Sequence, residues 1–201
     1  MLKLGILGGT FNPIHYGHLL MAERAKEALG ISKIVFMPTG NPPHKDTKTV
    51  ATADDRLKMV ELAVGNDENF IISKLEINRE GKTYTVDTLK ELKAEYGEDT
   101  EILFIIGADV LMDLPKWRSA GEVANLCKFA AIQRAGYNKE EFNRQAKYLY
   151  DEFGADIKEV EMPIVEISST DIRTRLSENL SIKFMLPDNV IDYIRDKELY
   201  L

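Results

Sequence analysis

The feature that most constrains the fold is a regular alternation between short apolar, β-branched runs and longer segments with helical periodicity. Several of the short runs are apolar throughout, which is typical of strands covered on both faces. A weaker strand is expected at residues 70–77. In residues 156–162 apolar side chains alternate with charged ones, which predicts an edge strand. The expected buried strands are residues 2–7, 33–38, 102–106 and 129–133.

Helical segments separate these runs. Residues 18–29 place leucine and alanine on one face and end at Gly30, and residues 52–64 open on a capping box at Thr52. Further helices are expected at residues 84–96 and 138–153. Strands that alternate with helices of this length predict βαβ units, and therefore an α/β, Rossmann-like, doubly wound parallel sheet. Such sheets bind ligands beyond the carboxyl ends of their strands.

The last part of the chain, residues 167–201, changes character. It reads as two or three short helices, one of which opens at Pro187, where proline suits the first helical turn. The sequence contains no linker, repeat or low-complexity segment. We therefore expect a single domain over residues 1–201, with an α/β core at 1–166 and a small C-terminal helical subdomain at 167–201.

Charge and cysteine content exclude several classes of protein. The net charge of −7 argues against nonspecific nucleic-acid binding. No apolar run approaches the roughly 20 residues of a membrane span, and residues 2–7 are too short for a signal peptide. The single cysteine, Cys127, lies in an apolar stretch, so a buried structural thiol is expected. These features predict a protein of the reducing cytoplasm.

The stretch after the first expected strand carries the strongest chemical signal. It reads Gly-Gly-Thr-Phe-Asn-Pro-Ile-His-Tyr-Gly-His over residues 8–18. Two glycines allow a tight turn and a close approach to a ligand, and the helix N-terminus beyond them is a natural phosphate site. His15 and His18 are three residues apart, so both can face one side of a helix that has begun and donate to phosphate oxygens. Zinc would need further ligands, and the only other imidazole or thiol candidates are His44 and Cys127.

Other polar residues lie where such a sheet binds ligands. Asp109 follows a buried strand at its carboxyl end. Ser168 opens a segment that caps a helix, and Arg173 on the same helix can reach a phosphate. Trp117 is by default a core residue. Lys45 follows a Pro-Pro stretch that stiffens its loop.

The turn resembles the signature of the nucleotidyltransferase superfamily, whose core is Thr/His-x-Gly-His and which here reads His15-Tyr16-Gly17-His18. Four later segments narrow the resemblance to bacterial nicotinate mononucleotide adenylyltransferases, over nearly the whole chain. One departure is Asn12, where that family more often has aspartate. The four segments are residues 42–45 (Pro-Pro-His-Lys), 83–89 (Thr-Tyr-Thr-Val-Asp-Thr-Leu), 107–109 (Gly-Ala-Asp) and 167–173 (Ile-Ser-Ser-Thr-Asp-Ile-Arg).

The resemblance implies a reaction between ATP and nicotinate mononucleotide that gives deamido-NAD and pyrophosphate. It assigns catalysis to His15, His18 and Arg173, with Mg²⁺ carried on the triphosphate and no dedicated protein site for a metal. The residues implied to bind ATP are Gly8, Gly9, Thr10, Phe11, His18, Gly107, Asp109, Ser168, Ser169, Thr170 and Arg173. The residues implied to bind the mononucleotide are Thr10, His44, Lys45, Thr85, Asp109, Trp117 and Arg134.

Three alternatives stay open on the sequence. One is another cofactor-making transferase, such as phosphopantetheine adenylyltransferase, although that family is usually shorter and lacks the segment around Thr85. A second is a nucleotide-sensing module without turnover. Class I tRNA synthetases share a similar turn, but the acidic balance of this chain suits tRNA poorly. Pairing of two copies through the expected edge strand also stays open.

Overall fold

A computed structural model describes residues 2–40, 50–65, 67–133, 136 and 138–200. Its strands form a six-stranded sheet in the order β3-β2-β1-β4-β5-β6, and the pairs β1–β4, β4–β5 and β5–β6 are parallel. The expected α/β, Rossmann-like class is confirmed, and the expected edge strand lies at an edge. The strands are β1 (Lys3–Gly9), β2 (Lys33–Pro38), β3 (Phe70–Ile72), β4 (Glu101–Gly107), β5 (Lys128–Ile132) and β6 (Ile157–Val160).

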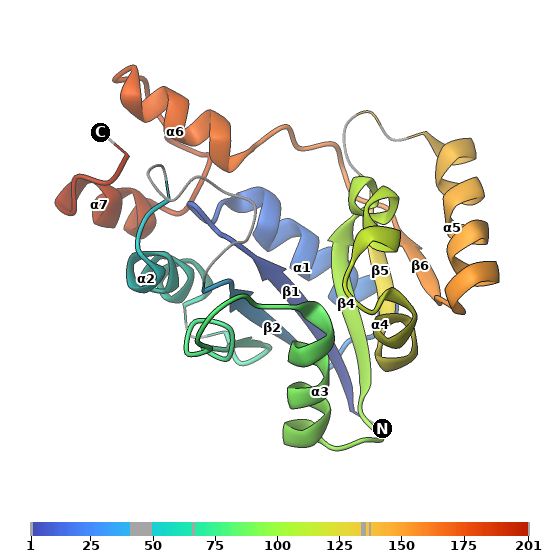
Figure 1. Ribbon diagram of the computed structural model, residues 1–201. Helices are drawn as coiled ribbons and strands as arrows, with labels where there is room; N and C mark the ends of the chain where they lie inside the picture. The colour runs from blue at the N-terminus through green and yellow to red at the C-terminus, as the bar shows by residue number, and fades with distance from the viewer. Residues whose placement is uncertain (1, 41–49, 66, 134–135, 137, 201) are drawn as a thin grey trace. The chain divides into compact units, whose positions relative to one another are not determined.

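The helices follow the expected alternation (Figure 1). Among the longer ones, α2 begins after Thr52, whose hydroxyl accepts from the amide of Asp55 at 3.1 Å and donates to the Asp55 carboxylate at 2.6 Å, so the expected cap at Thr52 is present. The helices are α1 (Tyr16–Leu29), α2 (Ala53–Val64), α3 (Thr85–Tyr96), η2 (Ala108–Met112), η3 (Leu114–Lys116), α4 (Ala120–Leu126), α5 (Lys139–Phe153), α6 (Ser169–Ser177) and α7 (Asp188–Asp196). The tail thus carries short helices, and Pro187 is the N-cap of α7, as expected.

Two segments differ from the sequence expectation. The strand expected over residues 70–77 ends at Ile72. Ser73 still donates its amide to the carbonyl of Phe36, but its hydroxyl then accepts from the amide of Leu75, and this local turn stops the ladder. The short helix α4 was not expected, because no side chain caps it and its apolar residues read as part of a longer apolar stretch.

The chain divides into two compact units, each built from segments far apart in sequence. In the first unit, α3 packs against α4, and α4 against α5. The second unit holds the glycine-rich turn and both tail helices. The first unit comprises Met1–Leu7, Met21–Val35 and Tyr84–Val165; the second comprises Gly8–Leu20, Phe36–Thr83 and Glu166–Leu201.

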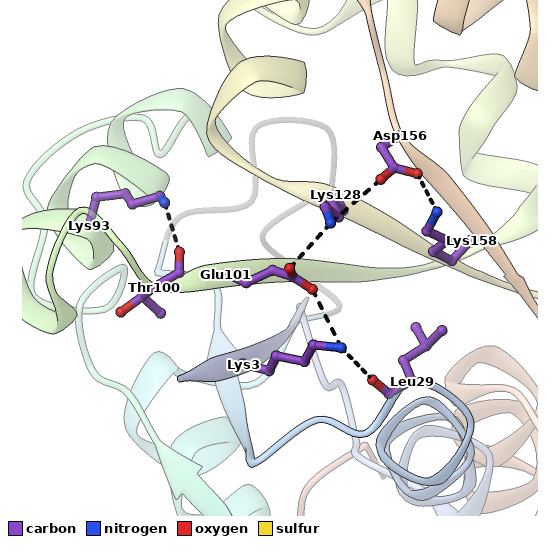
Figure 2. A network of polar contacts seen from close by, with 8 residues as sticks. All are labelled: Lys3, Leu29, Lys93, Thr100, Glu101, Lys128, Asp156 and Lys158. Atoms are coloured by element: carbon purple, nitrogen blue, oxygen red, sulfur yellow. Dashed lines mark hydrogen bonds and ion pairs between the residues drawn. The ribbon is translucent and has the colours of Figure 1, made fainter. Parts of the chain in front are cut away.

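A chain of ion pairs in the first unit joins the amino ends of four strands (Figure 2). The carboxylate of Glu101 lies 3.7 Å from the ammonium of Lys3 and 3.2 Å from that of Lys128. Lys128 also lies 3.7 Å from Asp156, which pairs with Lys158 at 2.9 Å. The Glu101 carboxylate raises the pKa of the Lys128 ammonium. These ion pairs lie at the amino ends of the strands, so they do not occupy the carboxyl ends, where sheets of this kind bind ligands.

Candidate active site

The glycine turn, residues 8–13, begins with the last two residues of β1. The two glycines, expected to form the tight turn, lie in the strand, and the chain turns after them around a buried phenylalanine. Phe11 has a φ of 47°, a left-handed conformation that costs a non-glycine residue about 1–2 kcal/mol. Its ring is only 2% exposed and packs edge-on against His18, with ring centroids 5.0 Å apart, and beside Phe36 at 6.1 Å. Burial of this ring offsets the backbone cost and fixes the turn against the histidine.

The two histidines of the expected motif lie together. Helix α1 begins at Tyr16, and the amides of His18 and Leu19 both donate to the carbonyl of His15. The rings of His15 and His18 have centroids 3.8 Å apart and planes inclined by 32°. His15 is 2% exposed and His18 is half-buried. The expectation that both side chains face one way is confirmed.

A backbone amide selects the tautomer of His18. The amide of His15 donates to Nδ1 of His18 at 3.3 Å, so this nitrogen acts as an acceptor. In a neutral imidazole the other nitrogen, Nε2, then carries the proton. His18 therefore presents an N–H donor suited to a phosphate oxygen.

Glycine is required at position 17 for lack of space. A Cβ atom there would lie 2.9 Å from both Cε1 and Nδ1 of the His15 ring, closer than ordinary contacts allow. It would also lie 3.5 Å from the carbonyl of Ile167. The glycine between the two histidines therefore makes room for the buried ring of His15.

The N-terminus of α6 is bound to the turn. The hydroxyl of Ser168 accepts from the amide of Asp171 at 3.1 Å, which confirms the expected cap. Ser169 donates its hydroxyl to the carbonyl of Pro13 at 2.8 Å. Arg173 donates from Nη1 to the carbonyl of Asn12 at 2.8 Å and from Nη2 to Thr170 Oγ1 at 3.3 Å. A guanidinium has more N–H groups than these two bonds use, so Arg173 can still bind a phosphate.

The first unit holds the other described residues of the expected site. Gly107 ends β4, and the exposed Asp109 follows in the first turn of η2, as expected for a residue beyond a strand's carboxyl end. Thr85 begins α3 and is half-buried. Trp117 is also half-buried, so it is not the fully buried core residue that is the default for tryptophan.

The ring of Trp117 contacts aromatic side chains of two strands, β4 and β5. It packs edge-on against Phe104, with ring centroids 6.0 Å apart, and against Phe129 at 6.5 Å. These perpendicular contacts use the edges of rings rather than a face-to-face stack. A half-exposed indole held in this way is suited to stacking on a planar ring.

Comparison with known proteins identifies the family. Residues 6–175 match the cytidylyltransferase-like family model. The chain is 43% identical, over 99% of its length and 94% of the relative's, to the "Probable nicotinate-nucleotide adenylyltransferase" of Thermoanaerobacter sp. (strain X514). The chain belongs to the nicotinate-nucleotide adenylyltransferase family.

A further relative agrees with this assignment, and a solved structure shares the fold. The chain is also 40% identical, over 100% of its length and 98% of the relative's, to the "Probable nicotinate-nucleotide adenylyltransferase" of Clostridium botulinum (strain Alaska E43 / Type E3). The solved Plasmodium falciparum nicotinic acid mononucleotide adenylyltransferase, complexed with NaAD, matches with a TM-score of 0.82 and 22% identity. That match covers 100% of this chain and 98% of the other, and it shows a shared fold. The family resemblance expected from the motifs is confirmed.

Some expected site residues are not placed. His44, Lys45 and Arg134, all expected to bind the mononucleotide, lie outside the described residues. Within the described ranges, no group of three or more histidine, cysteine, aspartate or glutamate side chains is arranged to hold a metal ion. In the same ranges, the structure contains no helix with the length and apolarity of a membrane span.

One buried arginine of the structure was not expected from the sequence. Arg56 is 1% exposed, and its guanidinium donates to three carbonyls: Thr10 at 2.7 Å, Gly40 at 2.9 Å and Ala51 at 3.1 Å. Burial lowers the pKa of Arg56, although arginine stays charged at all physiological pH values. The signal in the sequence was an arginine on the apolar stripe of α2, four residues before Val60.

Proposed function

We propose that this enzyme transfers the adenylyl group of ATP to nicotinate mononucleotide, giving deamido-NAD and pyrophosphate. The observation that carries the proposal is the histidine pair packed on the glycine turn, in a chain that belongs to this family. The pair, the N-terminus of α1 and the N-terminus of α6 lie in one compact unit, and each offers N–H groups to anionic oxygens.

The chemistry is a single displacement at phosphorus. A phosphate oxygen of the mononucleotide forms a bond to the α-phosphorus of ATP, and the bond from that phosphorus to the β-phosphate oxygen breaks. The electron pair leaves with pyrophosphate, so no covalent enzyme intermediate is needed. Catalysis then consists of positioning and stabilisation of charge on the phosphate oxygens.

The second unit supplies groups for the triphosphate. His18 donates from Nε2 to a phosphate oxygen, and His15 holds the tautomer of His18 through its own amide. Arg173 adds a positive charge that its bond to the turn carbonyl keeps near the phosphates. We also assign to ATP the backbone amides of Gly8, Gly9, Thr10 and Phe11 and the hydroxyls of Ser168, Ser169 and Thr170. Gly107 and Asp109 are assigned to ATP as well.

A further group of residues is assigned to the sugars and the pyridine ring. The exposed Asp109 suits ribose hydroxyls, and Gly107 allows close approach of the backbone. The half-buried ring of Trp117 offers a face to the pyridine ring. We assign Thr85 to the pyridine ring as well, because the family resemblance implies that role. Thr10, His44, Lys45 and Arg134 complete the residues that we assign to the mononucleotide.

A divalent cation accompanies the nucleotide in this reaction class, and we propose Mg²⁺. It would supply charge neutralisation on the triphosphate, and it prefers to retain several water ligands. We propose that this cation arrives bound to ATP, since Mg²⁺ is commonly bound through substrate phosphates. We also place the enzyme in the cytoplasm, because a chain with a single cysteine forms no internal disulfide and suits a reducing compartment.

The test is a comparison of acceptors. Pyrophosphate release from ATP and Mg²⁺ should be fast with nicotinate mononucleotide, slower with nicotinamide mononucleotide and absent with 4′-phosphopantetheine. Chromatography should then identify deamido-NAD as the product. Binding of ATP in calorimetry without turnover of any acceptor would contradict the proposal and favour a nucleotide-sensing module.

A further inference from the structure

Asn12 lies at the centre of the glycine turn and is bound from three distant segments. It is 2% exposed. Its side-chain Oδ1 accepts from the amide of Ala51 at 3.0 Å and from the hydroxyl of Tyr200 at 2.8 Å. Its carbonyl accepts from Arg173 at 2.8 Å. The position of the turn therefore depends on residues before α2, on α6 and after α7.

The direction of the Tyr200 bond follows from its neighbours. The amide of Ala51 can only donate, so the atom of Asn12 that faces it is the oxygen. The hydroxyl of Tyr200, which faces the same oxygen, must also donate. Burial raises the pKa of Tyr200 above its ordinary value, although the charges of Arg173 and Arg56 act in the opposite direction. The hydroxyl thus keeps its proton at neutral pH.

We propose that Tyr200 is a positioning residue for adenylyl transfer, acting through Asn12 on the turn that supports His18. This inference rests on the proposed function. Two donors on one oxygen fix the orientation of the Asn12 side chain. Asn12 follows Phe11, whose ring contacts the His18 ring with centroids 5.0 Å apart. Loss of the Tyr200 bond leaves the left-handed turn less constrained, and the imidazole donor moves with it.

A second tyrosine provides a matched control. Tyr193 in α7 donates its hydroxyl to Asp55 Oδ1 at 2.8 Å, so it makes one bond of the same length as Tyr200. The partner of Tyr193 lies in the first turn of α2 rather than in the glycine turn. Tyr193→Phe and Tyr200→Phe therefore remove the same chemical group, and only the second removes it from the turn.

The experiment compares the two variants in steady-state kinetics and thermal unfolding. Loss of one hydrogen bond of this kind changes a rate or equilibrium constant by a factor of about five. Tyr200→Phe should lower kcat/KM for ATP by about fivefold or more, whereas Tyr193→Phe should change it by less than about twofold, at similar losses in Tm. Equal kinetics for the two variants would overturn the proposal.

A double-mutant cycle tests the route through Asn12. If Tyr200 acts through this residue, Tyr200→Phe should lower kcat/KM by less than about twofold in an Asn12→Ala background. A full fivefold loss in that background would show that Tyr200 acts by another route and would also overturn the proposal. The cycle stays decisive if one single variant is less stable than expected, because it compares pairs of enzymes.

Hydrogen exchange separates this inference from the proposed function. Tyr200→Phe should speed exchange at the amides of Ala51 and of the glycine turn, and Tyr193→Phe should leave them unchanged. Unchanged exchange in Tyr200→Phe would contradict the positioning role. A wild-type enzyme that gives no product with any acceptor would contradict the proposed function instead, and the exchange rates would still decide on Tyr200.

Discussion

The ring centroids of His15 and His18 lie 3.8 Å apart, and the amide of His15 donates to Nδ1 of His18 at 3.3 Å. The first histidine therefore acts on the second through both its ring and its backbone. The backbone contribution does not depend on the side chain at position 15, so it survives substitution of that ring. Loss of the His18 ring, by contrast, removes the Nε2 donor itself.

We expect His18→Ala to lower kcat for pyrophosphate release by roughly 10²-fold or more, as for loss of one donor to a transition state. Tyr16→Phe is the matched control, because the Tyr16 side chain belongs to the same motif and is 43% exposed. It should change kcat by less than about twofold. A loss below about threefold in His18→Ala would remove His18 from the mechanism.

Gly17→Ala tests the space beside His15. A Cβ atom 2.9 Å from the buried ring must displace it, so we expect kcat/KM to fall at least roughly tenfold, although neither histidine is altered. Gly121→Ala is the control, because Gly121 is also the second residue of its helix and its added Cβ would lie 3.7 Å from Phe153, an ordinary contact. Normal activity in Gly17→Ala would show that the ring of His15 can shift without consequence.

Arg56→Met should lower the free energy of unfolding by about 3 kcal/mol, because it removes a buried guanidinium that donates to three part-buried carbonyls. Denaturant unfolding measures this difference. Arg24→Met is the comparison, since the Arg24 side chain is 43% exposed and pairs with Glu27 on α1 at 3.2 Å. We expect that change to cost less than about 0.5 kcal/mol. Similar losses for the two arginines would mean that water replaces the buried guanidinium at little cost.

Trp117 is the sole tryptophan, so its fluorescence reports on one position. If its ring stacks on the pyridine, nicotinate mononucleotide should quench the emission and ATP alone should not. Trp117→Ala should raise KM for the mononucleotide roughly tenfold, as for loss of one stacked ring, with KM for ATP unchanged. Trp117→Phe should recover part of that loss. An equal rise in both KM values would indicate a structural role only.

Cys127 should be inert in the folded protein. Burial raises the pKa of its thiol to about 12 from a reference of 9.0, so almost no thiolate exists at pH 8. A thiol reagent should react with unfolded protein only. The folded state holds the proton more tightly, so the contribution of this group to stability is complete below about pH 9 and is lost as the pH rises towards 12. Rapid labelling of native protein at pH 8 would contradict the burial of Cys127.

Local features of the fold were predictable from the sequence. Residues 33–38 form β2 with the expected bounds, because a strand apolar on both faces has a strong local signature. The caps at Thr52 and Ser168 were also readable, since a capping hydroxyl bonds within its own turn. The contact between the two histidines was also predictable, because residues three apart at the start of a helix lie on the same side of it.

What could not be predicted depends on contacts between distant residues. Arg56 donates a hydrogen bond to Thr10, 46 residues away in the sequence, and Tyr200 donates one to Asn12, 188 residues away. Nothing local distinguishes such an arginine from one on a solvated helix face, apart from its place on an apolar stripe. Helix α4 was missed for a different reason. Ser119 enters it in a left-handed conformation, with a φ of 55°, and caps it with no side-chain bond.

The bonds to Asn12 also set an order of events during synthesis. A ribosome makes the glycine turn among the first residues, but the partners of Asn12 follow 39, 161 and 188 positions later. A nascent chain that has reached β6 therefore carries both histidines and still lacks two of the three donors that hold their turn in place. Translation must reach residue 200 before all three donors are present, so an incomplete chain, even one that contains every strand of the sheet, should bind ATP poorly.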